Sequence, residues 1–96
     1  MIEVRETEAF ADWFAGLRDE RARAKIVARI RRLSLGNPGD VAPVGEGVSE
    51  MRIHHGPGYR VYFVMRGEVL AILLGGGDKS TQDRDIRAAI ALAQEV

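Results

Sequence analysis

The stretch Met51–Val64, M-R-I-H-H-G-P-G-Y-R-V-Y-F-V, decides the fold because it has the pattern of a β-hairpin. Apolar and polar side chains alternate on both sides of a G-P-G turn, as they do in strands with one buried face. The alternation places Arg52 and His54 opposite the apolar side chains of the first strand, and Arg60 and Tyr62 opposite those of the second. Arginine and histidine rarely face a core unpaired. The hairpin therefore predicts one apolar face for packing and one cationic face for an anionic ligand.

The residues after the hairpin predict another strand and a C-terminal helix. Arg66-Gly67 is a turn signal, and the apolar run within Glu68–Leu74 is typical of a central strand covered on both faces. Gly75–Gly77 come next, and such a run lets a backbone approach a ligand. Ser80 with Asp83 three residues later forms an S-x-x-D capping box for a helix over residues 81–94.

The residues before the hairpin predict a short strand and two helices. Residues 2–5 alternate as a strand does, and Thr7 is a good N-cap for a first helix. A second helix runs from Asp19 or Glu20 to about Leu35, joined tightly enough to the first to make an αα-hairpin. Helical spacing predicts that both helices bury an apolar stripe: Phe10, Trp13, Phe14 and Leu17 in the first, and Ala22, Ile26, Val27, Ile30 and Leu33 in the second. Residues 36–47 are expected to form a loop.

The elements together predict an α+β fold: an N-terminal strand and αα-hairpin, an antiparallel meander of three strands, and a C-terminal helix. With 96 residues the chain is expected to be a single domain, residues 1–96. It has no cysteine and no H-x-x-x-H spacing, so no metal site and no cofactor are expected. The start of the chain lacks a signal-peptide pattern and no apolar run approaches membrane-spanning length, which favours a cytoplasmic protein without membrane contact.

Three groups of residues are candidates for function. Around the hairpin, arginines bind phosphate bidentately and histidine carries protons near neutral pH; the alternative is a polar cross-strand face without a ligand. Lys79 stands at a helix start, where the helix dipole disfavours a cation. The second helix carries a basic stripe at Arg21, Lys25, Arg29 and Arg32, which is either a solvated face or a contact for a phosphate backbone.

Two blocks of sequence resemble a known family. They are G-D-V-A-P-V-G-E-G-V-S-E-M-R-I-H-H-G-P-G-Y-R-V-Y-F at Gly39–Phe63 and G-G-G-D-K-S-T-Q-D-R-D-I at Gly75–Ile86. Both resemble the HigB-like addiction module killer branch of the RelE/ParE toxin superfamily, which is related to phage Gp49-like proteins. The resemblance implies a toxin of a type II toxin–antitoxin module. It also implies a metal-independent mRNA interferase, an endoribonuclease that cuts translated mRNA on the ribosome.

The resemblance also implies roles for individual residues. The strand arginine of the family's Y-R-[LV]-x-[YF] motif falls on Arg60, the preceding strand's basic residue on Arg52, and the basic residue after the last strand's glycine on Lys79. His54 is the expected proton carrier on the same face, and Tyr62 is expected to contact substrate together with Arg21, Lys25 and Arg29. Some family members use a C-terminal tyrosine, whereas nothing aromatic follows Phe63 here. The acid–base groups are then Tyr62, His54 or Asp78, or groups of the ribosome.

The expected partners follow from the same resemblance. They are a helix-turn-helix antitoxin, mRNA with the ribosome, and operator DNA bound through the antitoxin. Two alternatives remain open at this point. One is a ParE-like toxin that inhibits DNA gyrase by binding, because that branch shares the fold. The other is a small adaptor domain without an activity of its own.

Overall fold

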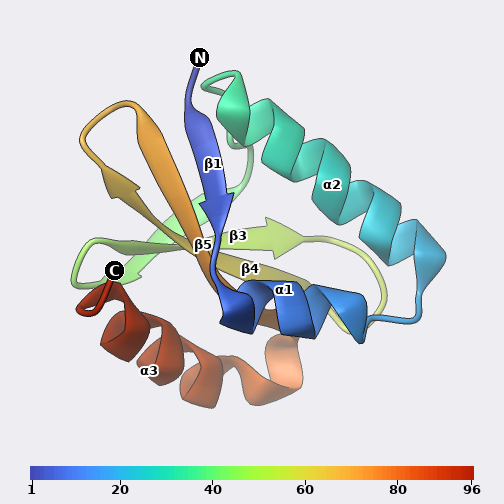
Figure 1. Cartoon of the computed structure of the whole chain (residues 1–96). Coiled ribbons are helices and arrows are strands. Elements are labelled where there is room, and N and C mark those ends of the chain that lie inside the picture. Colours follow the sequence, from blue (N-terminus) through green and yellow to red (C-terminus); the bar gives the residue numbers. More distant parts are fainter.

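The computed structural model describes residues 1–96, which fold into one five-stranded sheet with helices on both faces (Figure 1). The strand order is β1-β5-β4-β3-β2. No helix is long and apolar enough to cross a membrane. Along the chain the elements are β1 (Glu3–Glu6), α1 (Glu8–Ala15), α2 (Glu20–Ser34), β2 (Val41–Gly45), β3 (Val48–Ile53), β4 (Tyr59–Arg66), β5 (Leu70–Gly77), the 3-10 turn η1 (Lys79–Thr81) and α3 (Gln82–Ala93).

The predicted α+β class and order of elements are confirmed, and the structure adds one strand. Strand β2 lies within the stretch expected to be a loop, and it pairs with β3 at the edge of the sheet. Pro43 and three nearby glycines hide it from sequence patterns, because proline cannot donate to a neighbouring strand and glycine is rare in strands. An edge position tolerates Pro43, since one side of the strand needs no partner.

The hairpin forms as predicted and sets the register of the sheet. Strands β3 and β4 are antiparallel, with Arg52 directly opposite Arg60. Strand β5 lies between β4 and β1, and it is antiparallel to the first and parallel to the second. This central place agrees with its uninterrupted apolar run.

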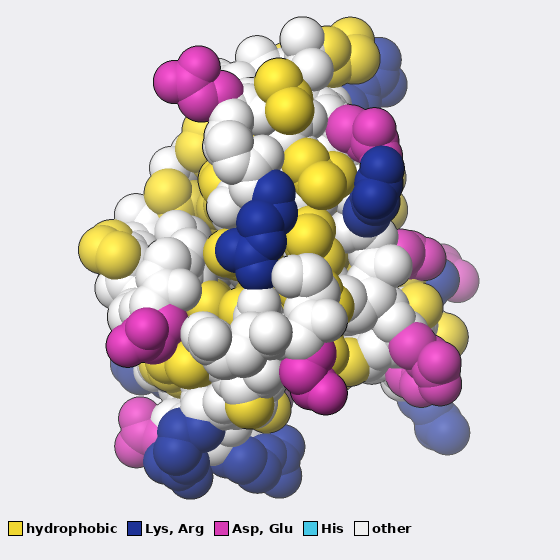
Figure 2. Space-filling view, turned by 60° about the vertical axis from the view of Figure 1, so that its left-hand side comes forward, with side chains coloured by type: hydrophobic (Ala, Val, Ile, Leu, Met, Phe, Trp, Pro, Cys, Tyr) yellow, Lys and Arg dark blue, Asp and Glu magenta, His cyan; other side chains and the backbone are white.

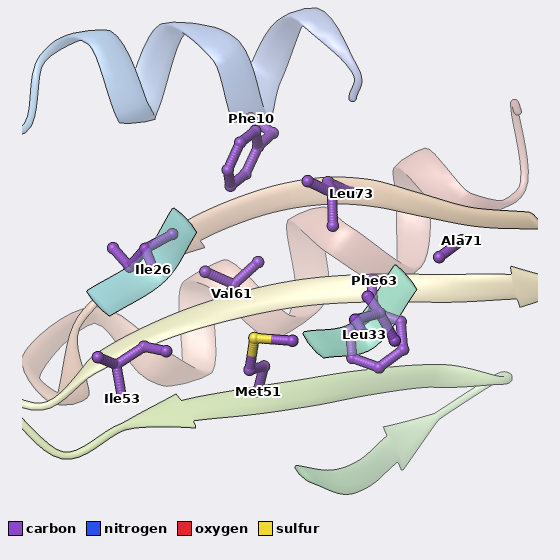
Figure 3. Close-up of a cluster of buried hydrophobic side chains, with 9 residues drawn as sticks. All are labelled: Phe10, Ile26, Leu33, Met51, Ile53, Val61, Phe63, Ala71 and Leu73. Carbon is purple, nitrogen blue, oxygen red and sulfur yellow. The ribbon is translucent and has the colours of Figure 1, made fainter. Parts of the chain in front are cut away.

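Each face of the sheet carries its own apolar core. Helices α1 and α2 cover one face, where nine buried side chains meet (Figure 3): Phe10, Ile26, Leu33, Met51, Ile53, Val61, Phe63, Ala71 and Leu73. Helix α3 covers the other face with a smaller cluster: Val48, Tyr62, Val64, Leu74, Ala89 and Ala93. The second core stops short of the β3–β4 turn, and polar side chains take its place there.

The helix caps and the helix cores follow the sequence with three differences. Thr7 accepts from Phe10 N at 3.2 Å and Asp19 caps α2, as the spacing predicts. Val27 was expected in the core but is 54% exposed, because α2 presents a narrower apolar stripe to the sheet. Trp13, Phe14 and Leu17 pack against the core and are only partly buried.

The third difference concerns the cap before α3. The predicted Ser80–Asp83 box is wrong, since Asp78 makes the cap and accepts from Ser80 N at 2.8 Å. The chain needs this earlier cap because a 3-10 turn precedes the helix.

The glycine run was expected to be a loop that approaches a ligand, and it is instead the last part of β5. A Cβ at Gly76 would clash with the indole ring of Trp13, and a Cβ at Gly77 would clash with the carboxylate of Asp85. The two glycines therefore let α1 and α3 pack directly on the strand.

Candidate anion-binding site

Arg60 and Lys79, which are far apart in sequence, come together beside the β3–β4 turn. A Cβ built at Gly58 would lie 3.5 Å from Nη1 of Arg60 and 3.5 Å from Cβ of Lys79. Arg60 Nη1 donates to the carbonyls of Gly58 at 3.2 Å and Tyr59 at 3.3 Å, which holds the guanidinium against the turn. Lys79 is exposed and makes no ion pair. Gly58 thus lies between the guanidinium of Arg60 and the base of the Lys79 side chain, and its missing Cβ lets a phosphate group approach the backbone there.

A buried carboxylate, Glu50, lies between the two strand arginines. Its side chain is 1% exposed, and its Oε2 lies 3.3 Å from Nε of Arg52. Its Oε1 lies 3.6 Å from Nε of Arg60, which is within ion-pair range but too long for a hydrogen bond. Glu50 is not among the residues expected from the sequence, although its position two residues before Arg52 places it on the same face. The face predicted to be cationic is therefore a cluster of two arginines around one carboxylate.

Two neutral side chains complete the environment of Glu50. Gln82, the first residue of α3, donates from Nε2 to Glu50 Oε1 at 2.5 Å. The Tyr62 hydroxyl donates to the same oxygen at 3.4 Å. Burial, followed by the charge of Glu50, raises the pKa of Tyr62. Tyr62 is fully buried, so it does not present a surface to substrate. Its hydroxyl instead contacts the buried Glu50 carboxylate.

Arg60 retains unused donor capacity. Its side chain is 11% exposed, and its buried Nε has no hydrogen-bond partner. A buried N–H without a partner is uncommon in folded proteins. Because backbone carbonyls hold the guanidinium at Nη1 and it stays charged, Arg60 presents a fixed positive charge to an anion that enters beside Gly58.

His54 does not join Arg60 and Lys79. It follows the end of β3, its side chain is 74% exposed, and its Nε2 lies 2.6 Å from Oδ2 of Asp40. The other carboxylate oxygen lies 3.6 Å from Nη1 of Arg52. The hydrogen bond from His54 and the charge of Arg52 hold the pKa of Asp40 below its usual range. Asp40 thus connects the predicted proton carrier to Arg52, at the edge of the cluster.

Of the four residues in the basic stripe of α2, Arg29 is held by hydrogen bonds, whereas the other three extend into solvent. Arg29 donates to the carbonyl of Arg52 at 2.6 Å, to that of Asp40 at 3.1 Å, and twice to that of Pro38. Its donors are therefore used to fasten α2 to the loop before β2. Arg21 and Lys25 are exposed and make no ion pair. No group of three or more His, Asp or Glu side chains is arranged to hold a metal ion.

Comparison with known proteins places the chain in a family. Residues 12–96 match the model of the family described as phage-derived protein Gp49-like. An uncharacterised protein of Haemophilus influenzae is 53% identical over 95 residues, which cover 99% of this chain and 96% of that protein.

Two solved structures from Helicobacter pylori share the fold. A copper-bound point mutant of a toxin gives a TM-score of 0.63 at 18% identity, covering 83% of this chain and 97% of the other. The solution structure of the conserved hypothetical protein HP0894 gives a TM-score of 0.51 at 21% identity over the same shares. The resemblance of the two sequence blocks to phage Gp49-like proteins is thereby confirmed, and the chain belongs to the phage-derived Gp49-like family.

Proposed function

We propose that this protein is the toxin of a toxin–antitoxin module and that it acts as an mRNA interferase in the cytoplasm. Family membership and the fold shared with a Helicobacter pylori toxin support the first part. The observation that carries the second is the meeting of Arg60 and Lys79 across Gly58. Cleavage of RNA by its own 2′-hydroxyl builds negative charge on the phosphate, and fixed cationic donors stabilise that charge. The carbonyls of Gly58 and Tyr59, together with the nearby Glu50 carboxylate, orient Arg60 for this task.

The proton-transfer groups expected from sequence do not suit the reaction. Burial keeps Tyr62 protonated, and His54 lies with Asp40 away from Lys79. Asp78 accepts from the Ser80 hydroxyl and backbone N–H, which holds the pKa of Asp78 low and makes it a weak base. This chain thus contributes charge stabilisation. We assign the proton carrier to the ribosome, which makes cleavage dependent on translation.

Induced expression with 5′-end mapping of messages tests the proposal. Wild type is expected to arrest growth and to create new 5′ ends within translated messages. Lys79→Ala is expected to slow cleavage by roughly 100-fold, the scale for loss of one donor to a transition-state oxyanion. Lys79 is exposed and unpaired, so this variant keeps its stability. Arg31→Ala, an exposed arginine on α2, serves as the control and keeps wild-type activity. Full cleavage by Lys79→Ala contradicts the proposed site.

The absence of a suitable proton carrier favours one second candidate, a toxin that binds DNA gyrase without cutting RNA. Other members of the superfamily keep the fold with such a target, and a fold does not fix an activity. The same mapping separates the two functions. A DNA-damage response with intact messages indicates gyrase, whereas new 5′ ends indicate the interferase.

An antitoxin is the partner that a toxin of this kind requires. We propose a helix-turn-helix antitoxin that neutralises the toxin and attaches the complex to its operator DNA. Co-purification of the toxin with the product of the adjacent gene tests this. Growth arrest that persists when both genes are expressed contradicts the pairing.

A further inference from the structure

A second basic surface lies outside the Arg60 cluster, in a groove between α2 and the end of β3. Its volume is about 270 Å³ and its lining residues are Lys25, Ala28, Arg29, Arg32, Ile53 and His54. Ile53 is buried and belongs to the core, so it forms a floor. The groove therefore combines an apolar floor with a basic rim.

The free cations of the groove stand in one row. Lys25 and Arg32 are exposed and make no ion pair, and Arg21 precedes them one turn earlier on the same side of the helix. At 1.5 Å per residue the row from Arg21 to Arg32 spans roughly 16 Å. By contrast, acidic and basic side chains are interspersed on the face shown in Figure 2. A row of unpaired cations of this length suits an extended polyanion rather than a single ion.

His54 adds a feature that an acidic peptide does not require. Its imidazole is 74% exposed and is fixed at Nε2 by Asp40. An exposed, oriented aromatic ring beside a basic groove offers a stacking surface for a nucleobase. The pairing of stacking ring and cationic row is typical of single-stranded nucleic acid sites.

The groove and the Arg60 cluster lie on opposite faces of the sheet, and Asp40 links them. Asp40 contacts His54 through one carboxylate oxygen and Arg52 through the other, and Arg52 lies opposite Arg60 in the sheet. We propose that this groove binds the backbone of single-stranded RNA and leads the strand around the C-terminal end of β3 to Arg60. The choice of RNA rests on the proposed function. The row of cations, by contrast, is a feature of the structure and does not depend on the proposed function.

Fluorescence anisotropy with a labelled oligouridine of roughly 12 nucleotides, a length that suits single-strand sites, tests the groove. The Lys79→Ala background slows cleavage of the RNA during measurement. In that background, Lys25→Ala with Arg32→Ala is expected to reduce the slope of log K against log salt by about 1.4, or about 0.7 for each lost phosphate contact. The control pair, Arg5→Ala with Arg31→Ala, removes the same charge from exposed positions outside the groove. An unchanged slope in the first pair, or an equal change in both, overturns the proposal.

Two further measurements identify the ligand. His54→Ala is expected to weaken binding by about fivefold or more, the scale of one stacked base, and an unchanged affinity overturns the stacking role. Polyglutamate at equal charge is expected to compete poorly. If it competes as well as RNA, the groove is a site for an acidic protein segment and the proposal is wrong. If RNA binding depends on the groove but no message is cleaved, the groove proposal holds and the proposed interferase fails. If messages are cleaved equally well after Lys25 and Arg32 are replaced, the interferase holds and the groove proposal fails.

Discussion

Replacing Glu50 by glutamine is expected to destabilise the fold by about 3 kcal/mol. The substitution keeps the shape and leaves an oxygen that accepts from Gln82, so the main change is the lost charge. At 3.6 Å and an effective dielectric constant of about 20, the attraction between Glu50 and Arg60 amounts to about 5 kcal/mol. Removing one partner of a buried pair costs about 3–5 kcal/mol. Arg60 is 11% exposed and so retains little water, whereas Arg52 at 39% exposed is solvated and adds little.

Urea unfolding with an unchanged dependence on denaturant concentration measures this loss. Glu68→Gln is the matched control, because Glu68 is exposed in the β4–β5 turn and makes no ion pair, and its change stays within about 0.5 kcal/mol. In the double variant Glu50→Gln/Arg60→Met the unpaired cation is gone, so part of the stability returns and the two single effects do not add. A Glu50→Gln change below about 0.5 kcal/mol, or additive effects of the two substitutions, contradicts a buried Glu50–Arg60 pair that stabilises the fold.

The glycine run, the α2 anchor and the buried tyrosine each give a further prediction. Gly76→Ala lowers the free energy of unfolding by about 1–3 kcal/mol, because the added methyl meets Trp13; Gly75→Ala, with nothing near its Cβ, changes it little, and equal effects contradict the packing. Arg29→Ala costs about 2–3 kcal/mol in the same assay through lost donations to carbonyls, and a neutral effect rules out anchoring. The Tyr62 hydroxyl has a raised pKa, first through burial, so its contribution to stability is present below about pH 10 and lost as pH rises further. The measurement is a titration of tyrosinate absorbance as the pH rises, and ionisation of both Tyr59 and Tyr62 before the protein unfolds contradicts a raised pKa of Tyr62.

The sequence was sufficient for the parts of the site that depend on local geometry. Alternation along β3 and β4 placed Arg52, Arg60 and Tyr62 on one face, because successive strand residues must point to opposite sides. The same rule places Glu50 on that face. Its burial, however, cannot be predicted from the sequence, because a carboxylate near an arginine in a strand is usually exposed to solvent. His54 follows the end of β3, where alternation no longer governs its direction.

Sequence alone was enough to identify every α-helix and every strand except β2, the two faces of the hairpin, and the family. Each of these depends on the spacing of neighbouring residues or on contiguous motifs. The tertiary structure alone decided that Lys79 meets Arg60 across Gly58, that Glu50 lies within the cluster, and that Arg29 serves the loop while Lys25 stays free. These contacts join residues from different elements, and their existence depends on how the helices cross the sheet. The physical reason is that the packing of distant segments selects which charges are paired and which remain available for a ligand.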